Sequence, residues 1–171
     1  MPDHGKLTFI IGGARSGKSA HAETLAMALP SPWVYIATAQ AYDHEMCERI
    51  ALHRSRRGEG WTTIDAPLDL AGALTALPDN QPVLVDCLTL WLTNHMLADH
   101  DLELECRRLT DVLSRPRGPW FVVSNEVGQG IVPDNALARR FRDDAGRLNQ
   151  QVAAIADTVL LMVAGLPLKV K

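Results

Sequence analysis

The sequence has few cysteines, and no two of them stand at metal-binding spacing. Only three occur in 171 residues, at Cys47, Cys87 and Cys106. An odd count without a C-x-x-C pair argues against both a disulfide framework and a zinc site. Long apolar runs are missing too, since a membrane-spanning helix needs roughly 20 such residues. The N-terminus also lacks the pattern of a signal peptide. We therefore expect a cytoplasmic protein with reduced thiols and no membrane span.

An excess of basic residues is also missing. The chain has 17 Lys and Arg against 20 Asp and Glu, which gives a formal net charge of −3. General nucleic-acid binders usually carry a basic excess, so we do not expect a nucleic-acid partner. The composition, 47% hydrophobic and 22% charged, is ordinary for a globular protein. At 171 residues, the length predicts that residues 1–171 form one domain.

Short apolar runs alternate with segments of helical periodicity. The runs predict strands, and the periodic segments predict helices. Apolar strands separated by helices are typical of an α/β fold, with a mostly parallel sheet flanked by helices. Ligands of such sheets bind beyond the carboxyl ends of the strands. The predicted strands are 7–11, 33–37, 83–85, 120–123 and 159–163, with 168–170 as a candidate edge strand, and the predicted helices are 18–29, 43–57, 68–77, 88–98, 102–114 and 135–156.

A glycine-rich loop between the first strand and the first helix fits the pattern G-x-x-x-x-G-K-[ST] of phosphate-binding loops. Glycines let successive backbone N–H groups face the phosphates, and the start of the next helix adds partial positive charge. In such a loop the lysine contacts the terminal phosphates, and the hydroxyl is a ligand for Mg²⁺. The sequence therefore predicts a P-loop made of Gly12, Gly13, Ala14, Arg15, Ser16, Gly17, Lys18 and Ser19.

The apolar strand at 83–85 ends in a carboxylate, Asp86. In P-loop proteins an acid at such a strand end helps to hold Mg²⁺. An aspartate there can equally well cap the next helix. Because it accompanies a P-loop, Asp86 is our second predicted metal ligand, beside Ser19.

The segment 43–57 combines helical spacing with a basic C-terminal end. His53 shares a helix face with Ile50 and three arginines, Arg49, Arg56 and Arg57. One interpretation is an amphipathic helix whose basic end is solvated. The other is an anion site in which His53 is a nucleophile, because neighbouring cations disfavour the imidazolium form. The spacing does not choose between them.

Further along the chain, the polar stretch 124–133 follows a predicted strand and contains two glycines and a proline. It either borders the site or is an ordinary connection. Arginines on the predicted helix 135–156 fit a solvated face. Trp61 and Asp65 lie on or near a short strand, and the pattern alone assigns them no chemistry.

Together these residues resemble one family, the bifunctional adenosylcobinamide kinase/adenosylcobinamide-phosphate guanylyltransferase of cobalamin assembly. The resemblance spans nearly the whole chain, and its most specific parts are the block 125–133 and the spacing to His53. It is carried by the P-loop, the block 35–39, the segment 43–53 with Trp61 downstream, the block 125–133, and the tail 138–150.

The resemblance implies two reactions. The enzyme phosphorylates adenosylcobinamide with ATP or GTP, and a histidine, here His53, then forms a covalent GMP intermediate that yields adenosylcobinamide-GDP. Some members carry Glu at the positions of Asp65 and Asp86, and position 52 is Leu here, so His53 has no neighbouring histidine. The nucleotide contacts implied are the P-loop with Ala37, Thr38, Ala39, Arg54, Ser55, Arg56, Arg57, Asp65 and Asp86.

Further expectations follow from the resemblance. It implies a RecA-like P-loop fold, a homotrimer, Mg²⁺ used with GTP or ATP, no tightly bound cofactor, and a corrinoid substrate. Two other functions compete with it. A monofunctional P-loop kinase would form no covalent nucleotide adduct. A regulatory GTPase normally carries Asn-Lys-x-Asp, and no Asn in this chain precedes a Lys.

Overall fold

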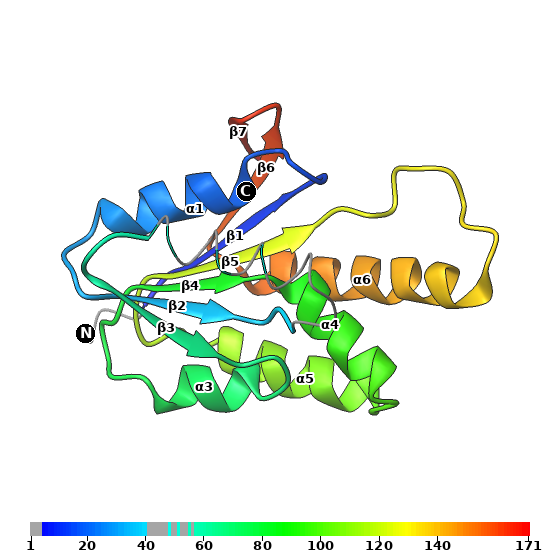
Figure 1. Cartoon of the computed structure of the whole chain (residues 1–171), viewed down its shortest axis with the longest axis horizontal. Coiled ribbons are helices and arrows are strands. Elements are labelled where there is room, and N and C mark those ends of the chain that lie inside the picture. Colours follow the sequence, from blue (N-terminus) through cyan, green and yellow to red (C-terminus); the bar gives the residue numbers. More distant parts are fainter. Residues whose placement is uncertain (1–4, 41–47, 49–50, 52–54, 56) are drawn as a thin grey trace.

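The computed structural model describes residues 5–40, 48, 51, 55 and 57–171. Strands and helices alternate along the chain, as the sequence predicts (Figure 1). The strands are β1 Leu7–Gly12, β2 Trp33–Ala37, β3 Trp61–Asp65, β4 Val83–Asp86, β5 Trp120–Asn125, β6 Thr158–Val163 and β7 Leu166–Lys169. The helices are α1 Lys18–Met27, α3 Leu70–Ala76, α4 Leu88–Leu97, α5 Leu102–Leu113 and α6 Ala136–Ile155.

All seven strands belong to one sheet, in the order β3-β2-β4-β5-β1-β6-β7. Neighbours from β3 through β6 pair in parallel, and β7 pairs antiparallel with β6 at one edge. Helix α1 lies over one face of the sheet, while α3, α4, α5 and α6 lie over the other (Figure 1). The prediction of a mostly parallel sheet flanked by helices is therefore confirmed.

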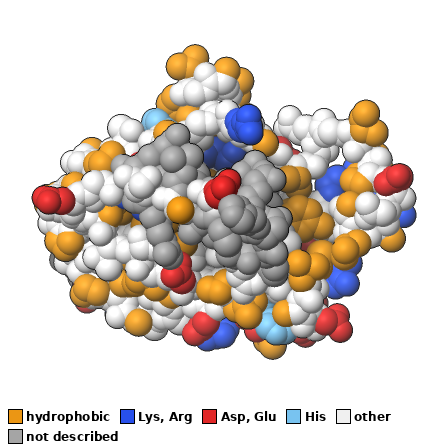
Figure 2. Space-filling model, in the orientation of Figure 1, with side chains coloured by type: hydrophobic (Ala, Val, Ile, Leu, Met, Phe, Trp, Pro, Cys, Tyr) orange, Lys and Arg blue, Asp and Glu red, His pale blue; other side chains and the backbone are white. Residues whose placement is uncertain are grey.

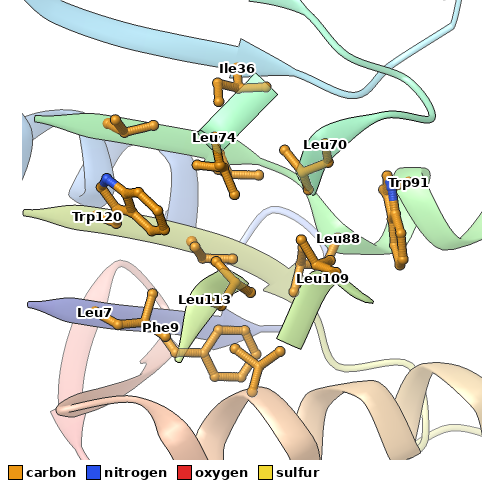
Figure 3. Packing of buried hydrophobic residues seen from close by; sticks show 14 of the residues in the cluster. Leu7, Phe9, Ile36, Leu70, Leu74, Leu88, Trp91, Leu109, Leu113 and Trp120 are labelled. Carbon is orange, nitrogen blue, oxygen red and sulfur yellow. The ribbon is translucent and has the colours of Figure 1, made fainter. Parts of the chain in front are cut away.

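The strands send alternate side chains into two apolar clusters, as the two-residue period of a strand requires. On β2, Val34 and Ile36 join the cluster under the four helices, whereas Tyr35 and Ala37 join the cluster under α1. Figure 3 shows the larger cluster, which joins leucines of α3, α4 and α5 with Trp91, Trp120 and, on β1, Leu7 and Phe9. Strands apolar on both faces are buried between helix layers, which explains their continuous hydrophobic runs.

Side-chain caps mark where α3, α5 and α6 begin. The carboxylate of Asp69 accepts a hydrogen bond from Gly72 N, Asp101 caps α5, and Asn135 caps α6. These caps satisfy backbone donors that a helix leaves unpaired at its start. The predicted helix 68–77 therefore begins at Leu70, two residues late, and the other helix ends agree within two residues. Most of the predicted helix 43–57 lies outside the described residues, although 48, 51 and 55 are helical.

The β6–β7 hairpin exposes apolar side chains. Val163, Leu166, Leu168 and Val170 are each more than half exposed. Apolar side chains gather at the top of the molecule in Figure 2, where the hairpin projects in Figure 1. Within the described part of the chain, no helix is long and apolar enough to cross a membrane.

The packing of α5 predicts a large difference between two leucines on that helix. Leu109 is fully buried in the larger cluster, while Leu104 is 54% exposed. We expect Leu109→Ala to lower the free energy of unfolding by about 2–5 kcal/mol, because it removes buried contacts and leaves a cavity. Leu104→Ala should change it by less than about 0.5 kcal/mol. Urea unfolding of both variants measures this, and equal effects would contradict the assigned burial.

A contact between the buried His95 and the exposed His100 joins the end of α4 to the turn before α5. His95 is 2% exposed, and its Nε2 lies 3.1 Å from Leu68 O, to which it donates. His95 Nδ1 lies 2.9 Å from His100 Nδ1, so the neutral His95 ring accepts from His100 there. Burial lowers the pKa of His95 below its ordinary value, and the Leu68 carbonyl and nearby Glu105 offset this only in part.

The burial of His95 makes stability depend on pH. Because the pKa of His95 is lower in the folded than in the unfolded chain, the unfolded chain binds more protons, so protonation favours unfolding. We expect the neutral, buried His95 to contribute its full share of the free energy of unfolding above pH 6.5, the ordinary pKa of histidine. This share should be lost progressively as the pH falls below that value. Urea unfolding across this range should show a steeper decline for wild type than for His95→Gln. His21→Gln, a change of the same kind on α1, should keep the wild-type slope.

Candidate active site

The phosphate loop connects β1 to α1. Gly12 is the last residue of β1, and Gly17 immediately precedes α1 with a left-handed backbone, φ 93°. Such a backbone favours glycine. A Cβ at Gly17 would lie 3.1 Å from Gly165 Cα, and one at Gly12 would lie 2.7 Å from Met162 O. Both glycines of the motif are therefore required by the packing of the loop against β6 and the turn that follows it.

Lys18, the first residue of α1, turns its side chain back into the loop. Its Nζ donates to Gly13 O at 2.5 Å and lies 3.4 Å from Ser16 Oγ. The residue is only 6% exposed, and burial lowers the pKa of Lys18, with the Asp86 carboxylate acting in the opposite direction. A buried ammonium near backbone N–H groups at a helix start forms a cradle for an anion.

Asp86 faces the loop across the sheet. Its Oδ2 accepts a hydrogen bond from Ser19 Oγ at 2.6 Å and another from Tyr35 OH at 3.1 Å. The residue before α4 is Cys87, so Asp86 does not cap that helix. Carboxylate and hydroxyl oxygens are the hard donors that Mg²⁺ takes, usually together with phosphate and water oxygens. Ser19 and Asp86 fit such an ion.

Tyr35 connects this carboxylate to Arg57. The Arg57 Cζ lies 3.5 Å from the centroid of the Tyr35 ring, a cation–π contact. Burial, followed by the Asp86 charge, raises the pKa of Tyr35, so its hydroxyl stays protonated and donates. Arg57 Nη1 is buried and has no hydrogen-bond partner among the residues that the structure describes. A buried guanidinium donor without a partner is costly, and a phosphate oxygen would satisfy it.

Buried polar side chains fix the strand ends next to the site. Thr38 Oγ1 donates to Cys87 O at 2.7 Å and accepts from Cys87 N at 2.8 Å. Asn94 Nδ2 donates to Thr38 O at 2.7 Å. Burial raises the pKa of the Cys87 thiol to about 11, so it is uncharged at neutral pH. The backbone after β2 is thereby attached to the start of α4, directly after Asp86.

The structure places several of the predicted nucleotide contacts along one edge of the sheet. Ala37 pairs in register with Asp86 on one side and with Asp65 on the other, and Thr38 and Ala39 follow β2. Asp65 is exposed at the end of β3, and Ser55 is exposed. His53, Arg54 and Arg56 lie outside the described residues, so their predicted roles stay predictions.

Sequence reasoning missed the roles of Tyr35 and Gly165. In the sequence, Tyr35 stands in an apolar run and in the block 35–39 that carries the resemblance, but neither pattern predicts the hydrogen bond that it donates to Asp86. Gly165 N donates to Ser16 O at 2.9 Å, so the turn after β6 supports the phosphate loop. A polar ring inside an apolar strand was a usable signal for Tyr35, whereas nothing local marks Gly165.

Comparison with known proteins now assigns the chain to a family. A family model described as cobinamide kinase / cobinamide phosphate guanyltransferase matches residues 8–170. The chain belongs to this family. It is 48% identical over 165 residues to the bifunctional adenosylcobalamin biosynthesis protein CobP of Pseudomonas aeruginosa, with 95% of each chain covered. It is 39% identical over 181 residues to the bifunctional adenosylcobalamin biosynthesis protein CobU of Escherichia coli, with 96% of this chain and 99% of that one covered.

The fold of this cobinamide kinase family member is also similar to solved structures of other P-loop proteins. A crystal structure of the RadB recombinase has a TM-score of 0.54 at 19% identity, covering 92% of this chain and 74% of that chain. A prototypical ATPase from the type III secretion system of pathogenic bacteria has a TM-score of 0.56 at 13% identity, covering 92% and 51%. At such identities the likeness concerns the fold alone, and it confirms the expected RecA-like P-loop architecture.

The Tyr35–Asp86 contact predicts a Mg²⁺-dependent change in nucleotide affinity. Tyr35→Phe keeps the ring beneath Arg57 but removes the hydroxyl that donates to Asp86. We expect GTP affinity in Mg²⁺ to fall about fivefold, the equivalent of one hydrogen bond, with little change in EDTA. Tyr35→Leu, which also removes the cation–π contact, should weaken binding in both conditions. Calorimetric titrations with and without Mg²⁺ measure this, and an equal loss for Tyr35→Phe in both buffers would be evidence against it.

Proposed function

We propose that this chain is a bifunctional transferase that phosphorylates adenosylcobinamide and then transfers GMP from GTP to the phosphorylated product. The observation that carries the proposal is the arrangement of three residues at the phosphate loop of a chain in this family. Lys18 turns into the loop, and Ser19 donates a hydrogen bond to Asp86. The family's description names both activities, which favours this function over a monofunctional kinase.

In the kinase reaction, a hydroxyl oxygen of cobinamide attacks the γ-phosphorus of ATP or GTP. The bond between that phosphorus and the β–γ bridging oxygen breaks, the nucleoside diphosphate leaves, and the hydroxyl proton passes to solvent. Lys18 and the loop N–H groups bind the phosphates and stabilise the charge on the transferring group. Ser19 and Asp86 would hold Mg²⁺, which neutralises phosphate charge when bound.

In the guanylyl transfer, an imidazole nitrogen of His53 attacks the α-phosphorus of GTP and pyrophosphate leaves. The cobinamide phosphate oxygen then attacks the same phosphorus, the P–N bond breaks, and His53 is regenerated as adenosylcobinamide-GDP forms. A covalent intermediate divides one difficult displacement into two easier ones. Arg57, with its buried unpaired Nη1, is a suitable donor to a phosphate oxygen during this reaction.

The contacts named from the sequence complete the proposal. Arg54, Ser55, Arg56 and Asp65 are proposed to bind nucleotide, together with Arg57 and Ala37–Ala39. A homotrimer remains part of the proposal, and light scattering on the purified protein measures it. The corrinoid substrate is assigned through the family alone.

Covalent labelling tests the guanylyl transfer. We expect GTP labelled at the α-phosphate to label the protein through a bond that is labile in acid and stable in alkali, as a phosphoramidate is. GTP labelled at the γ-phosphate should not label it. His53→Ala should abolish the adduct because the nucleophile is gone, while His21→Ala, on α1, should keep it.

The same experiment separates the alternatives. A monofunctional kinase would transfer the γ-label to cobinamide without forming any α-labelled adduct. Its kinase activity would be unchanged in His53→Ala. Labelling that persists in His53→Ala would move the nucleophile to another residue. No labelling of wild type, with kinase turnover intact, would falsify the guanylyltransferase half.

A further inference from the structure

The turn that joins β6 to β7 lies against the phosphate loop. Val163 pairs with Leu166, so the turn has only two residues, Ala164 and Gly165. The backbone N–H of Gly165 donates to Ser16 O at 2.9 Å. In Figure 1 the hairpin projects beside the start of α1, where the phosphate loop ends. Two segments that are far apart in the sequence are thus joined at the loop.

The backbone of this turn is left-handed at both residues. The φ angle is 50° at Ala164 and 82° at Gly165. Two positive φ angles are what a two-residue hairpin turn of type I′ requires, and asparagine and glycine adopt them most readily. Alanine adopts a positive φ only where the surrounding structure holds it there. The hydrogen bond to Ser16 is one such restraint.

The turn and the loop are packed too closely to move independently. A Cβ at Gly17 would lie 3.1 Å from Gly165 Cα, which is tighter than an ordinary van der Waals contact. A Cβ at Gly165, by contrast, would meet nothing within 4 Å. A substitution at Gly165 can therefore change the backbone preference of the turn without crowding its neighbours.

The hydrogen bond from Gly165 sets the orientation of the peptide group between Ser16 and Gly17. This peptide is trans, and in a planar trans peptide the carbonyl and the N–H point in opposite directions. Because the Ser16 carbonyl points to the turn, the Gly17 N–H points away from it. No residue that the structure describes accepts a hydrogen bond from this N–H. It stands at the start of α1, where unpaired N–H groups favour anions.

We propose that Gly165 is a positioning residue for nucleotide binding. Its N–H holds the Ser16–Gly17 peptide so that the Gly17 N–H donates to a phosphate oxygen of the bound nucleotide. This rests on the proposed function, because it assumes that the phosphate loop binds a nucleoside triphosphate. Without the restraint, rotation of the peptide brings a carbonyl toward the phosphates in place of a donor. Loop N–H groups surround the α- and β-phosphates, so GTP and GDP both depend on the contact.

Calorimetric titration of GTP and GDP into two variants of Gly165 tests the proposal. Gly165→Val disfavours a positive φ because valine is β-branched, so the turn changes and its N–H leaves Ser16 O. We expect both nucleotides to bind about tenfold or more weakly, as when a hydrogen bond to a charged group is lost. Gly165→Asn adds a side chain of similar size that tolerates a positive φ, and it should retain most of the wild-type affinity. Leu168→Ala, which shortens an exposed side chain of β7, should bind both nucleotides as wild type does.

The NMR signal of the Gly17 amide separates positioning from general support of the fold. In isotope-labelled wild type, GDP should move the Gly17 amide proton downfield, as a new hydrogen bond to an anion does. Hydrogen exchange at the Gly165 amide should slow at the same time, because the coupling between the two contacts is reciprocal. The Gly17 shift should be much smaller in Gly165→Val and normal in Gly165→Asn. The wild-type measurements decide the question even if Gly165→Val folds poorly.

Three results would overturn the proposal. Equal losses of affinity in Gly165→Val and Gly165→Asn would show that the φ angle of the turn has no part in binding. Wild-type affinity in Gly165→Val would exclude the positioning role. A Gly17 amide that does not shift when GDP saturates wild type would exclude the phosphate contact. The proposed function is judged separately, since wild type that binds GTP without phosphorylating cobinamide would contradict that function alone.

Discussion

The site depends on one hydrogen bond, the 2.6 Å contact between Ser19 Oγ and Asp86 Oδ2. It joins the helix that follows β1 to the end of β4, across the intervening strand β5. Only a parallel sheet brings these ends to a common edge, and only α1 lying over that face carries Ser19 across. The same Asp86 oxygen also accepts from Tyr35 OH, so the contact connects α1, β4 and β2.

Polar side chains buried around that contact form hydrogen bonds with groups of the neighbouring strands and helices. Thr38 and Asn94 bond the backbone next to Asp86, and Ser124 bonds Asn149 behind β5. Unpaired buried groups are costly, so a network of this kind holds only one arrangement of the strand ends. Among the buried side-chain polar atoms of the described residues, Arg57 Nη1 alone has no hydrogen-bond partner.

The sequence predicted what depends on local pattern. Apolar β-branched runs identified the central strands, the glycine spacing identified the loop, and the end of the apolar run 83–85 identified Asp86. Two strands were only partly foreseen: β3 is half exposed, and β7 is wholly exposed at the edge, so neither shows a buried run. A polar ring in an apolar strand marks Tyr35 as unusual, but the groups that Tyr35 and Gly165 contact depend on strand order, which tertiary packing sets.

The strand order also divides the residues at the carboxyl ends of the strands into two groups. Asp86 lies between two halves of the edge, with Asn125 and Gly12 on one side and Ala37 and Asp65 on the other. Under the proposed function, the first half binds the terminal phosphate that the kinase transfers. The second half includes the ends of the connection between β2 and β3, which carries His53. Under the same proposal, the kinase reaction depends on the phosphate loop, and the guanylyl transfer also depends on the connection between β2 and β3.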